Sequence, residues 1–359
     1  MSQINKVYII AEVGVNHNGS LKMAKELIDE AILSGVDAVK IQTFIAQNEI
    51  SCFAPKAEYQ LDNTENNESQ LEMVRKLELT EEQHYILRDH CLAKGIDFIS
   101  TPFDLESVDL LVNKLNIDCI KVSSGDLTCA PLLLAIAKSG KQVILSTGMS
   151  TLAEIEEALG VLAFGYLGCN KKPSKGMFQQ AYCCEDGQKI LKLKVQLLHC
   201  TTEYPAPFED VNLRVLDTLR HAFGLPVGFS DHTQGISVPI AAVAMGACII
   251  EKHFTLDKGL PGPDHKASLE PDELKNMVQG IRQVEKAMGC KMKIPALSEI
   301  KNKPIARKSL VARTQVKMGE SFTEDNLTFK RPGSGISPME YWNIIGTKAT
   351  RDYQEDEGI

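Results

Sequence analysis

Eight short apolar, β-branched stretches recur along this 359-residue chain, and a segment whose apolar residues have helical spacing follows each of them. Near-continuously apolar strands that alternate with helices are typical of a parallel sheet covered by helices. Eight such units within about 290 residues match the (β/α)₈ TIM barrel, so we predict an α/β fold of this type. The predicted strands are residues 7–14, 38–44, 97–103, 119–125, 142–148, 195–202, 226–232 and 248–255. The predicted helices are residues 20–33, 80–94, 105–115, 130–138, 151–164, 211–222, 235–245 and 271–288.

Residue types that begin and end helices flank several of the helical segments. Ser20, Thr80 and Thr151 precede three of them and predict N-caps, because a hydroxyl oxygen there accepts a hydrogen bond from an unpaired backbone N–H. Glycines follow several segments and predict their ends, since glycine readily adopts the left-handed conformation. These glycines are Gly35, Gly95, Gly140 and Gly289.

The carboxyl end of every predicted strand carries polar residues, whereas its beginning is apolar. In a barrel these ends converge on one face and build one active site. In an open doubly wound sheet, only the strands at the switch point need polar ends. Residues 14–19 read GVNHNG and lack the second glycine of a dinucleotide-binding loop. Both observations favour a barrel over a Rossmann fold.

The repeating pattern occupies residues 1–289 and changes after them. Residues 290–305 are rich in Lys and Pro and predict a linker. Residues 306–359 contain short strand-like pieces and predict a small, mostly β domain that cannot hold a large core of its own. Within the barrel, the polar residues 45–79 form a long insertion of the kind that often covers an active site. Residues 165–190 predict a surface excursion without a catalytic role.

Charge and composition exclude several classes of protein. The net charge of −8 makes nucleic acid an unfavourable partner. The apolar runs are shorter than the about 20 residues that cross a bilayer, and the first residues lack the features of a secretory signal. Ten cysteines without short regular spacing fit reduced thiols better than disulfides. We therefore expect a cytoplasmic protein that binds neither nucleic acid nor a membrane.

Two histidines end neighbouring strands of the predicted barrel. His232 and His253 lie at the ends of the seventh and eighth strands, in SDHT and EKHFT. Adjacent strands are about 4.8 Å apart, so both imidazoles can bind one metal ion at the barrel mouth. Glu251 and Asp264 lie near the same rim, and two histidines with oxygen ligands suit Mn²⁺ or Mg²⁺. The alternative is a pair of ordinary polar residues near strand ends.

Two lysines lie inside predicted strands, where a lysine is rare unless it is paired. Lys40 and Lys121, in the second and fourth strands, predict an anionic ligand that carries a phosphate or a carboxylate. Two alternatives remain open: a lysine that forms a Schiff base, as in an aldolase, and a structural salt bridge to a residue such as Glu12. Hydroxyl groups that can donate to phosphate oxygens lie at nearby strand ends, at Thr101, Ser124, Ser146 and Ser230.

Further titratable residues have less specific positions. Glu12 ends the first strand and predicts a general base or a carboxylate that orients water. His84, His90 and His221 fall in helical segments, and we expect them to face solvent. His265 lies on a loop beyond the eighth strand and can approach a substrate.

Several of these motifs together carry a family resemblance. They read AEVGVNHNGS, DFISTPFD, KVSSGD, ILSTGM, LLHCTTEYPAP, SDHT, EKHFT and GPDHKASLEP. In this order they resemble the sialic acid synthase family, and the resemblance runs from about residue 7 to about residue 355. The C-terminal ARKSLVA and KRPGSGIS are similar to the antifreeze-like (SAF) domain of these enzymes.

The resemblance implies a transferase that condenses phosphoenolpyruvate with an N-acylated amino sugar. The sugar reacts as its open-chain aldehyde, a divalent metal polarises that aldehyde, and phosphate leaves by C–O cleavage after water has added. The first expectation for the sugar is N-acetylmannosamine, which gives N-acetylneuraminate. The alternative is 2,4-diacetamido-2,4,6-trideoxymannose, which gives N,N′-diacetyllegionaminate, and pseudaminate synthesis is third.

The resemblance also implies roles for individual residues. His232 and His253 match metal ligands, and Glu12 matches a carboxylate that handles water or a sugar hydroxyl. Arg331 matches an arginine that the SAF domain lends to the partner's active site, which implies a domain-swapped homodimer.

Together with Glu12, the catalytic candidates are Lys40, Lys121 and Glu251. Phosphoenolpyruvate contacts are implied for Lys40, Thr101, Lys121, Ser124, Ser146 and Ser230. Sugar-side contacts are implied for Gln42, Tyr204 and Asp264, and the substrate-side positions Asp126 and Thr202 differ from the Glu and Asn of related synthases.

Overall fold

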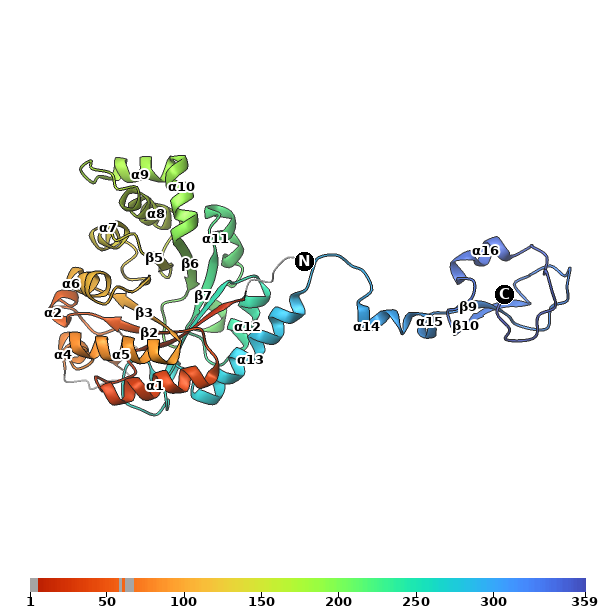
Figure 1. Cartoon of the computed structure of the whole chain (residues 1–359), viewed down its shortest axis with the longest axis horizontal. Coiled ribbons are helices and arrows are strands. Elements are labelled where there is room, and N and C mark those ends of the chain that lie inside the picture. Colours follow the sequence, from red (N-terminus) through yellow and green to blue (C-terminus); the bar gives the residue numbers. More distant parts are fainter. Residues whose placement is uncertain (1–5, 58–59, 62–67) are drawn as a thin grey trace. The chain divides into compact units, whose positions relative to one another are not determined.

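A closed parallel barrel is the centre of the N-terminal unit (Figure 1). The computed structural model describes residues 6–57, 60–61 and 68–359. In this part of the chain, eight strands follow one another around the barrel, and β1 closes it by pairing with β8. The predicted α/β barrel is thus confirmed. The barrel strands are β1 (Tyr8–Gly14), β2 (Ala38–Thr43), β3 (Asp97–Pro102), β4 (Cys119–Val122), β5 (Gln142–Ser146), β6 (Val195–Cys200), β7 (Val227–Asp231) and β8 (Ile249–His253).

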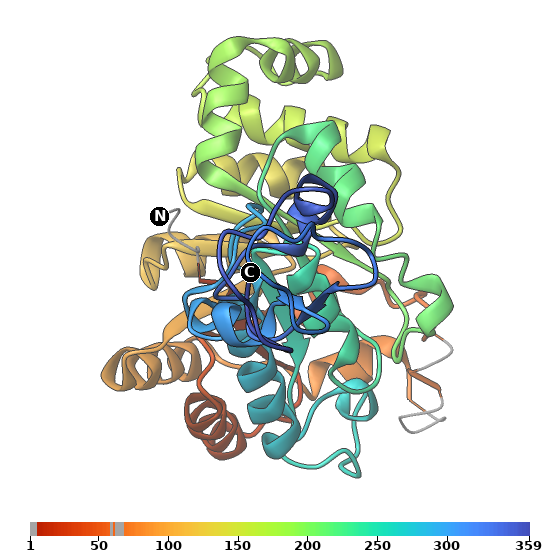
Figure 2. The ribbon, with the colours of Figure 1, turned by 90° about the vertical axis from the view of Figure 1, so that its right-hand side faces the viewer.

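Helices surround the barrel in the views of Figures 1 and 2. They connect one strand to the next, as the alternation in the sequence predicts. The segment predicted as one helix over residues 105–115 begins as an α-helix and continues as the π-helix η1 (Leu110–Lys114). The α-helices of this unit are α1 (Leu21–Ser34), α2 (Ala46–Glu49), α4 (Gln70–Arg75), α5 (Glu81–Lys94), α6 (Leu105–Asp109), α7 (Ala130–Lys138), α8 (Leu152–Tyr166), α9 (Lys175–Cys183), α10 (Glu185–Lys194), α11 (Val215–Phe223), α12 (Ser237–Ala244) and α13 (Pro271–Met288). Short 3-10 turns lie at η2 (Phe208–Asp210) and η3 (His265–Ala267).

The predicted caps set where helices begin and end. The side chains of Ser20, Thr80 and Thr151 each accept a hydrogen bond from the backbone N–H three residues further on. Gly35 and Gly95 end α1 and α5 in the left-handed conformation, with φ of 83° and 73°. Because each helix stops there, the chain is free to enter the next barrel strand within three residues.

The inward-facing side chains of the strands include an apolar layer below the polar residues of the strand ends. Ile10 and Glu12 lie two residues apart on β1, so both point to the same face of the strand. The lower layer is apolar and fills the barrel below the active-site end, so the polar residues above it rest on a packed floor. This layer is formed by Ile10, Ala38, Ile99, Ile144, Leu198 and Ile249.

Residues 165–190 form a surface excursion, but one with regular structure. The helices α9 and α10 pack against α8 on the outside of the barrel (Figure 2). Each buries few residues, Ala181 on α9 and Gly187 and Leu191 on α10, so the apolar pattern is too sparse to predict helices. Residues of this excursion do not line the cavity described below, which agrees with the absence of a predicted catalytic role.

The insertion after β2 is described in part. The short helices α2 and α4 belong to it, whereas residues 58–59 and 62–67 lie outside the described residues. The described part returns to the barrel mouth and lines its cavity. It therefore belongs to the candidate site, as a long insertion at this face of the barrel predicts.

The chain divides into two units, Met1–Gly289 and Cys290–Ile359. The second unit has its own small core, to which Leu310, Val316, Phe322 and Tyr353 contribute. It contains an antiparallel pair of strands, which confirms the predicted small β domain. The segment predicted as a linker carries the short, exposed helices α14 and α15. The elements of this unit are α14 (Leu297–Ile300), α15 (Lys303–Ala306), β9 (Ser309–Ala312), β10 (Leu327–Lys330), the turn η4 (Pro338–Glu340) and α16 (Tyr341–Ile344). Among the helices in the described residues of the whole chain, none is long and apolar enough to span a membrane.

Candidate active site

The polar strand ends meet in one cavity at the carboxyl end of the barrel. The cavity has a volume of about 270 Å³. Every residue predicted for the site lines it, except Asp126 and Arg331. The predicted residues that line it are Glu12, Lys40, Gln42, Thr101, Lys121, Ser124, Ser146, Thr202, Tyr204, Ser230, His232, Glu251, His253 and Asp264.

Lys40 is buried between two carboxylates. Its Nζ lies 2.5 Å from Glu12 Oε1 and 3.7 Å from Glu251 Oε2, and it donates a hydrogen bond to Thr101 Oγ1 at 3.3 Å. Burial alone lowers a lysine pKa, but Glu12 and Glu251 outweigh burial and raise the pKa of Lys40. Lys40 therefore stays protonated and is poorly suited to act as a Schiff-base nucleophile. The salt bridge between Lys40 and Glu12, which is one of the alternatives that the sequence leaves open, is present within the same cavity.

Lys121 has less negative charge around it. Its Nζ donates hydrogen bonds to Ser146 Oγ at 2.7 Å and to the Val122 carbonyl at 3.1 Å, while Glu251 Oε1 is 3.6 Å away. Burial lowers the pKa of Lys121, and the attraction of Glu251 only partly offsets it. A bound anion would supply the missing negative charge. Lys121 thus fits the predicted role of holding a phosphate or a carboxylate.

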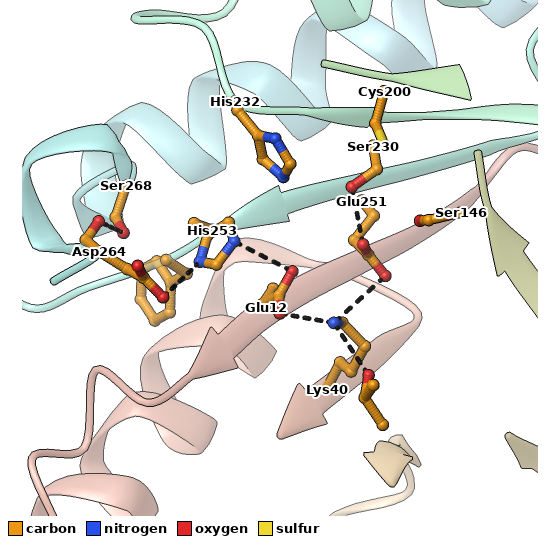
Figure 3. A network of polar contacts seen from close by, with 12 residues as sticks. Glu12, Lys40, Ser146, Cys200, Ser230, His232, Glu251, His253, Asp264 and Ser268 are labelled. Atoms are coloured by element: carbon orange, nitrogen blue, oxygen red, sulfur yellow. Dashed lines mark hydrogen bonds and ion pairs between the residues drawn. The ribbon is translucent and has the colours of Figure 1, made fainter. Parts of the chain in front are cut away.

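Glu12 connects the lysine side of the cavity to the histidine side (Figure 3). The strand registers place Glu12 opposite Lys40 on β2 and opposite His253 on β8. Its Oε1 contacts Lys40, and its Oε2 lies 3.3 Å from His253 Nε2. Burial raises the pKa of Glu12, but His253, Lys40 and Lys121 outweigh that effect and hold it below its ordinary value. Glu12 is therefore an ionised carboxylate at neutral pH. The contacts drawn in Figure 3 run from Ser268 and Asp264 through His253, Glu12 and Lys40 to Glu251 and Ser230.

The two histidines lie side by side with Tyr204 next to them. The ring centroids of His232 and His253 are 5.5 Å apart, and the Tyr204 ring is 4.2 Å from that of His232. His232 Nδ1 is 2.6 Å from the carbonyl oxygen of Thr201. Since a carbonyl only accepts, Nδ1 carries the proton and Nε2 keeps a lone pair in the neutral ring. Burial and the neighbouring His253 lower the pKa of His232 to about 3, so the ring is neutral at pH 7, as a metal ligand must be.

The donor set fits an open metal site. His253 Nδ1 is buried and has no hydrogen-bond partner among the described residues, because Asp264 Oδ2 is 3.8 Å away. Within the described ranges, no three His, Cys, Asp or Glu side chains are arranged as a complete metal site. Two imidazoles leave coordination positions for water or a substrate oxygen, as in catalytic rather than structural metal sites.

Some histidines do not lie where the sequence led us to expect them. The prediction that His84 faces solvent is wrong: it is buried and contacts Thr43 Oγ1 and the Thr80 carbonyl, each at 2.9 Å. His265 does not line the cavity, because its ring contacts Thr255 Oγ1 at 2.7 Å inside the loop after β8. His221 is exposed, as predicted, and His90 is partly exposed beside Asp29.

Two predicted site residues lie outside the cavity. The carboxylate of Asp126 accepts a hydrogen bond of 2.5 Å from Ser123 Oγ in its own loop, and Asp126 is not among the residues that line the cavity. Arg331 follows β10 in the C-terminal unit, and its side chain is exposed there. The structure therefore gives Asp126 a contact within its own loop, and it describes Arg331 within the C-terminal unit alone.

Comparisons with known proteins place the chain in a family. A model of the NeuB family matches residues 27–293, which is most of the barrel unit. The chain belongs to the NeuB family. A model of the SAF domain matches residues 307–359, which confirms the predicted resemblance of the C-terminal unit.

Two NeuB-family relatives are similar to this chain over nearly its full length. The N,N′-diacetyllegionaminic acid synthase of Campylobacter jejuni is 54% identical over 99% of both chains. The enzyme of the same name from Legionella pneumophila is 44% identical over 95% of this chain and 90% of its own. A crystal structure of N-acetylneuraminic acid synthetase from Leptospira borgpetersenii, in complex with citrate, is 32% identical with a TM-score of 0.67, over 83% of this chain and 90% of that one. The prediction of a synthase enzyme of this family is confirmed.

One wall of this NeuB-family cavity was missed by the sequence analysis. It is apolar and comes largely from the insertion after β2 and the ends of β1 and β3. Glu49, the last residue of α2, also lines the cavity and was not predicted. In the sequence, Glu49 is marked only by its position seven residues after the predicted site residue Gln42. The segment around it has no clear helical or strand periodicity. The apolar wall consists of Val15, Phe44, Ile50, Met73, Val74, Leu77 and Phe103.

Proposed function

We propose that this NeuB-family enzyme condenses phosphoenolpyruvate with 2,4-diacetamido-2,4,6-trideoxymannose, giving N,N′-diacetyllegionaminate and phosphate. The observation that carries the proposal is the 54% and 44% identity with two N,N′-diacetyllegionaminic acid synthases, against 32% with an N-acetylneuraminic acid synthetase. From the family resemblance in the sequence, N-acetylmannosamine is the first expectation. The relatives support the alternative better, and we adopt it.

Two parts of the cavity lining support this choice. One part carries Lys40 and Lys121 with serine and threonine hydroxyls, which suits an anion. Another part is the apolar wall, which suits methyl groups, since each buried CH₂ or CH₃ contributes about 0.8 kcal/mol. The diacetamido sugar has a methyl group at C6 and two acetyl groups. N-acetylmannosamine has a polar CH₂OH group at C6 and one acetyl group, so it matches the wall less well.

The anionic substrate is assigned to the lysine end. Lys121 and Ser146 form a hydrogen-bonded pair that can turn toward a phosphate, and Lys40 is held beside Thr101. Ser230 donates to Glu251 Oε1 at 2.8 Å, which keeps that carboxylate oriented between the two lysines. We infer that this arrangement holds phosphoenolpyruvate with its C3 toward the histidine side, and that Ser124 at the cavity edge adds a further hydroxyl donor.

The histidine side is assigned to the sugar aldehyde. His232 and His253 would hold a divalent cation, Mn²⁺ or Mg²⁺, which when bound supplies Lewis-acid polarisation of the aldehyde oxygen. The ionised Glu12 lies between this side and Lys40, where it can orient the water that adds to C2. A new C–C bond forms between C3 of phosphoenolpyruvate and the aldehyde carbon, and the C–O bond to phosphate breaks after water has added. Gln42, Tyr204, Asp264 and Thr202 line the space left for the sugar.

The test is release of inorganic phosphate with each sugar in parallel. We expect phosphate only when phosphoenolpyruvate, a sugar and a divalent metal are all present. We expect kcat/KM for the diacetamido sugar to exceed that for N-acetylmannosamine by about 10- to 100-fold, the range for one or two apolar groups in a fitted pocket. An equal or higher value with N-acetylmannosamine contradicts the choice of sugar. A Schiff-base aldolase would give product from pyruvate without any phosphate, so the same assay separates that alternative.

We also propose a homodimer in which Arg331 of one chain completes the site of the other. The support is the resemblance of KRPGSG to the SAF segment that carries such an arginine, and the exposure of the Arg331 side chain in its own unit. Arg331→Ala is expected to lower kcat/KM by about tenfold or more, because a charge-assisted hydrogen bond to the substrate is lost. Its thermal unfolding should match that of the unchanged enzyme, since the side chain is exposed.

Mixed dimers show whether Arg331 acts across subunits. The Arg331→Ala chain keeps an intact barrel, and a His253→Ala chain keeps an intact Arg331. Random pairing of equal amounts makes half of the dimers mixed, each with one complete site, so about a quarter of the unchanged activity should return. No recovery on mixing, with dimers present in solution, rules out the exchange.

A further inference from the structure

Glu49 faces the cavity with an unsatisfied oxygen. It is the last residue of α2, which follows β2 at the barrel mouth. Its Oε2 is buried, and no side chain or backbone group among the described residues donates a hydrogen bond to it. A buried polar atom without a partner costs about 1–3 kcal/mol, so its retention in the cavity calls for a ligand group.

Two neighbouring acidic residues accept hydrogen bonds from the backbone, and Glu49 differs from them. Glu78 Oε2 accepts a hydrogen bond from the Ala46 N–H at 3.0 Å, and Asp104 Oδ2 accepts one from the Ile45 N–H at 2.9 Å. Both therefore have a structural task at the start of α2. The Glu49 carboxylate does not stabilise the start of α2 in this way, although Glu49 lies only three residues after Ala46 on the same helix.

The electrostatic surroundings of Glu49 disfavour a bare charge. Among the described residues Glu49 Oε2 has no hydrogen-bond partner, and the charges that act on its carboxyl group, Asp126 and Asp104, are both negative. Burial, with a contribution from these two acids, raises the pKa of Glu49 to about 7. A hydrogen-bond donor from a ligand would stabilise the ionised form at neutral pH.

The apolar wall restricts the kind of hydrogen-bond donor that a ligand can place next to Glu49. Ile50, Met73 and Phe103 line the cavity together with Glu49, and the insertion after β2 also adds the polar residues Gln60 and Gln70 to the lining. A group with several hydroxyls would leave some of them against these apolar side chains without partners. An acetamido group has one N–H donor next to a methyl group, so it can satisfy the carboxylate and the wall together.

We propose that Glu49 accepts a hydrogen bond from the N–H of the second acetamido group of the acceptor sugar, and so determines the preference for a diacetamido sugar. The inference rests on the proposed function and names the residue that selects between its two candidate sugars. Glu49 is thus a specificity-determining residue at the sugar end, separate from the lysines and histidines that bind phosphoenolpyruvate and metal.

The experiment compares Glu49→Ala, Glu49→Gln and a control in steady-state phosphate release with both sugars. For Glu49→Ala we expect KM for the diacetamido sugar to rise about 10- to 100-fold, the effect of losing a hydrogen bond to a charged group. KM for N-acetylmannosamine, KM for phosphoenolpyruvate and kcat should change less than about twofold. Glu49→Gln keeps an acceptor oxygen without the charge, so its KM should rise only about 3- to 10-fold.

Glu106→Gln is the matched control. Glu106 is an exposed residue of α6. Its carboxylate accepts a hydrogen bond of 3.3 Å from Asn48, which is on α2 next to Glu49, and Glu106 does not line the cavity. We expect it to leave both KM values unchanged. If Glu49→Ala fails to fold, the nearly isosteric Glu49→Gln decides alone.

The outcomes separate this inference from the proposed function. If the unchanged enzyme prefers the diacetamido sugar and both Glu49 variants keep that preference, Glu49 has no role in selection and the inference is overturned. Equal losses with both sugars, or a raised KM for phosphoenolpyruvate, overturn it as well. If the unchanged enzyme prefers N-acetylmannosamine, the proposed function and the inference fail together.

Discussion

Chelation of the divalent metal with EDTA is expected to lower phosphate release by about 10³-fold or more, and added Mn²⁺ or Mg²⁺ to restore it. Polarisation of a carbonyl oxygen by a metal contributes several kcal/mol, and each 1.36 kcal/mol changes a rate tenfold. The expectation rests on two buried imidazoles with ring centroids 5.5 Å apart, one of them neutral at pH 7. The measurement is initial phosphate release before and after chelation, with both substrates at saturating concentration.

Histidine variants show whether the metal acts at this place. His253→Ala should lose activity to a similar extent and regain none of it with added metal. His221→Ala is the matched control, because His221 is an exposed histidine on α11 that does not line the cavity. It should behave as the unchanged enzyme. Full activity after complete removal of metal would contradict the assignment of His232 and His253 as ligands.

Asp231→Ala is expected to lower the free energy of unfolding of the barrel by about 3–5 kcal/mol. Asp231 and Lys252 are both 0% exposed, and Lys252 Nζ lies 2.7 Å from Asp231 Oδ2. Removal of one partner leaves a buried charge without compensation, which is the costly case for a buried ion pair. Burial lowers the pKa of Lys252 even though the neighbouring Asp231 opposes this shift, so the charge of Lys252 depends on its partner.

A surface pair provides the control for this stability measurement. Lys22 and Glu26 form an exposed pair on α1 at 3.7 Å, so Glu26→Ala should cost only about 0.3–0.5 kcal/mol. Unfolding by urea is best followed by far-UV circular dichroism, because the single tryptophan, Trp342, lies in the C-terminal unit and not in the barrel. Similar losses for Asp231→Ala and Glu26→Ala would refute the uncompensated-charge argument.

The fold and most of the site follow from local features of the sequence. Strand–helix alternation predicts the barrel, and the hydroxyl at Thr80 and the glycine at Gly95 mark both ends of α5. The polar strand ends predict the cavity, because the carboxyl ends of barrel strands meet at one face. Glu12, Lys40 and His253 are therefore found from their positions at strand ends alone.

Other features depend on contacts that no local pattern records. Lys252 lies between the inward-facing Glu251 and His253, so it faces outward, and only the register with β7 shows its partner Asp231. His84 is on a helix face that packs on the barrel, where Thr43 satisfies it. The apolar lining by Met73, Val74 and Leu77 comes from the return of the insertion after β2 to the barrel mouth, which is a tertiary event. Sequence periodicity carries no information about such a return.

The position of Glu12 has a thermodynamic consequence. One of its oxygens contacts Lys40 on the side where we propose the anionic substrate, and the other faces His253, a proposed metal ligand, 3.3 Å away. A ligand that changes the charge beside Lys40 or beside His253 must alter the energy of the Glu12 carboxylate, which contacts both. It therefore alters the affinity for the ligand on the opposite side of Glu12. Linkage requires this effect to be reciprocal, so occupancy by the anionic substrate and occupancy by the cation change each other's binding constants by the same factor.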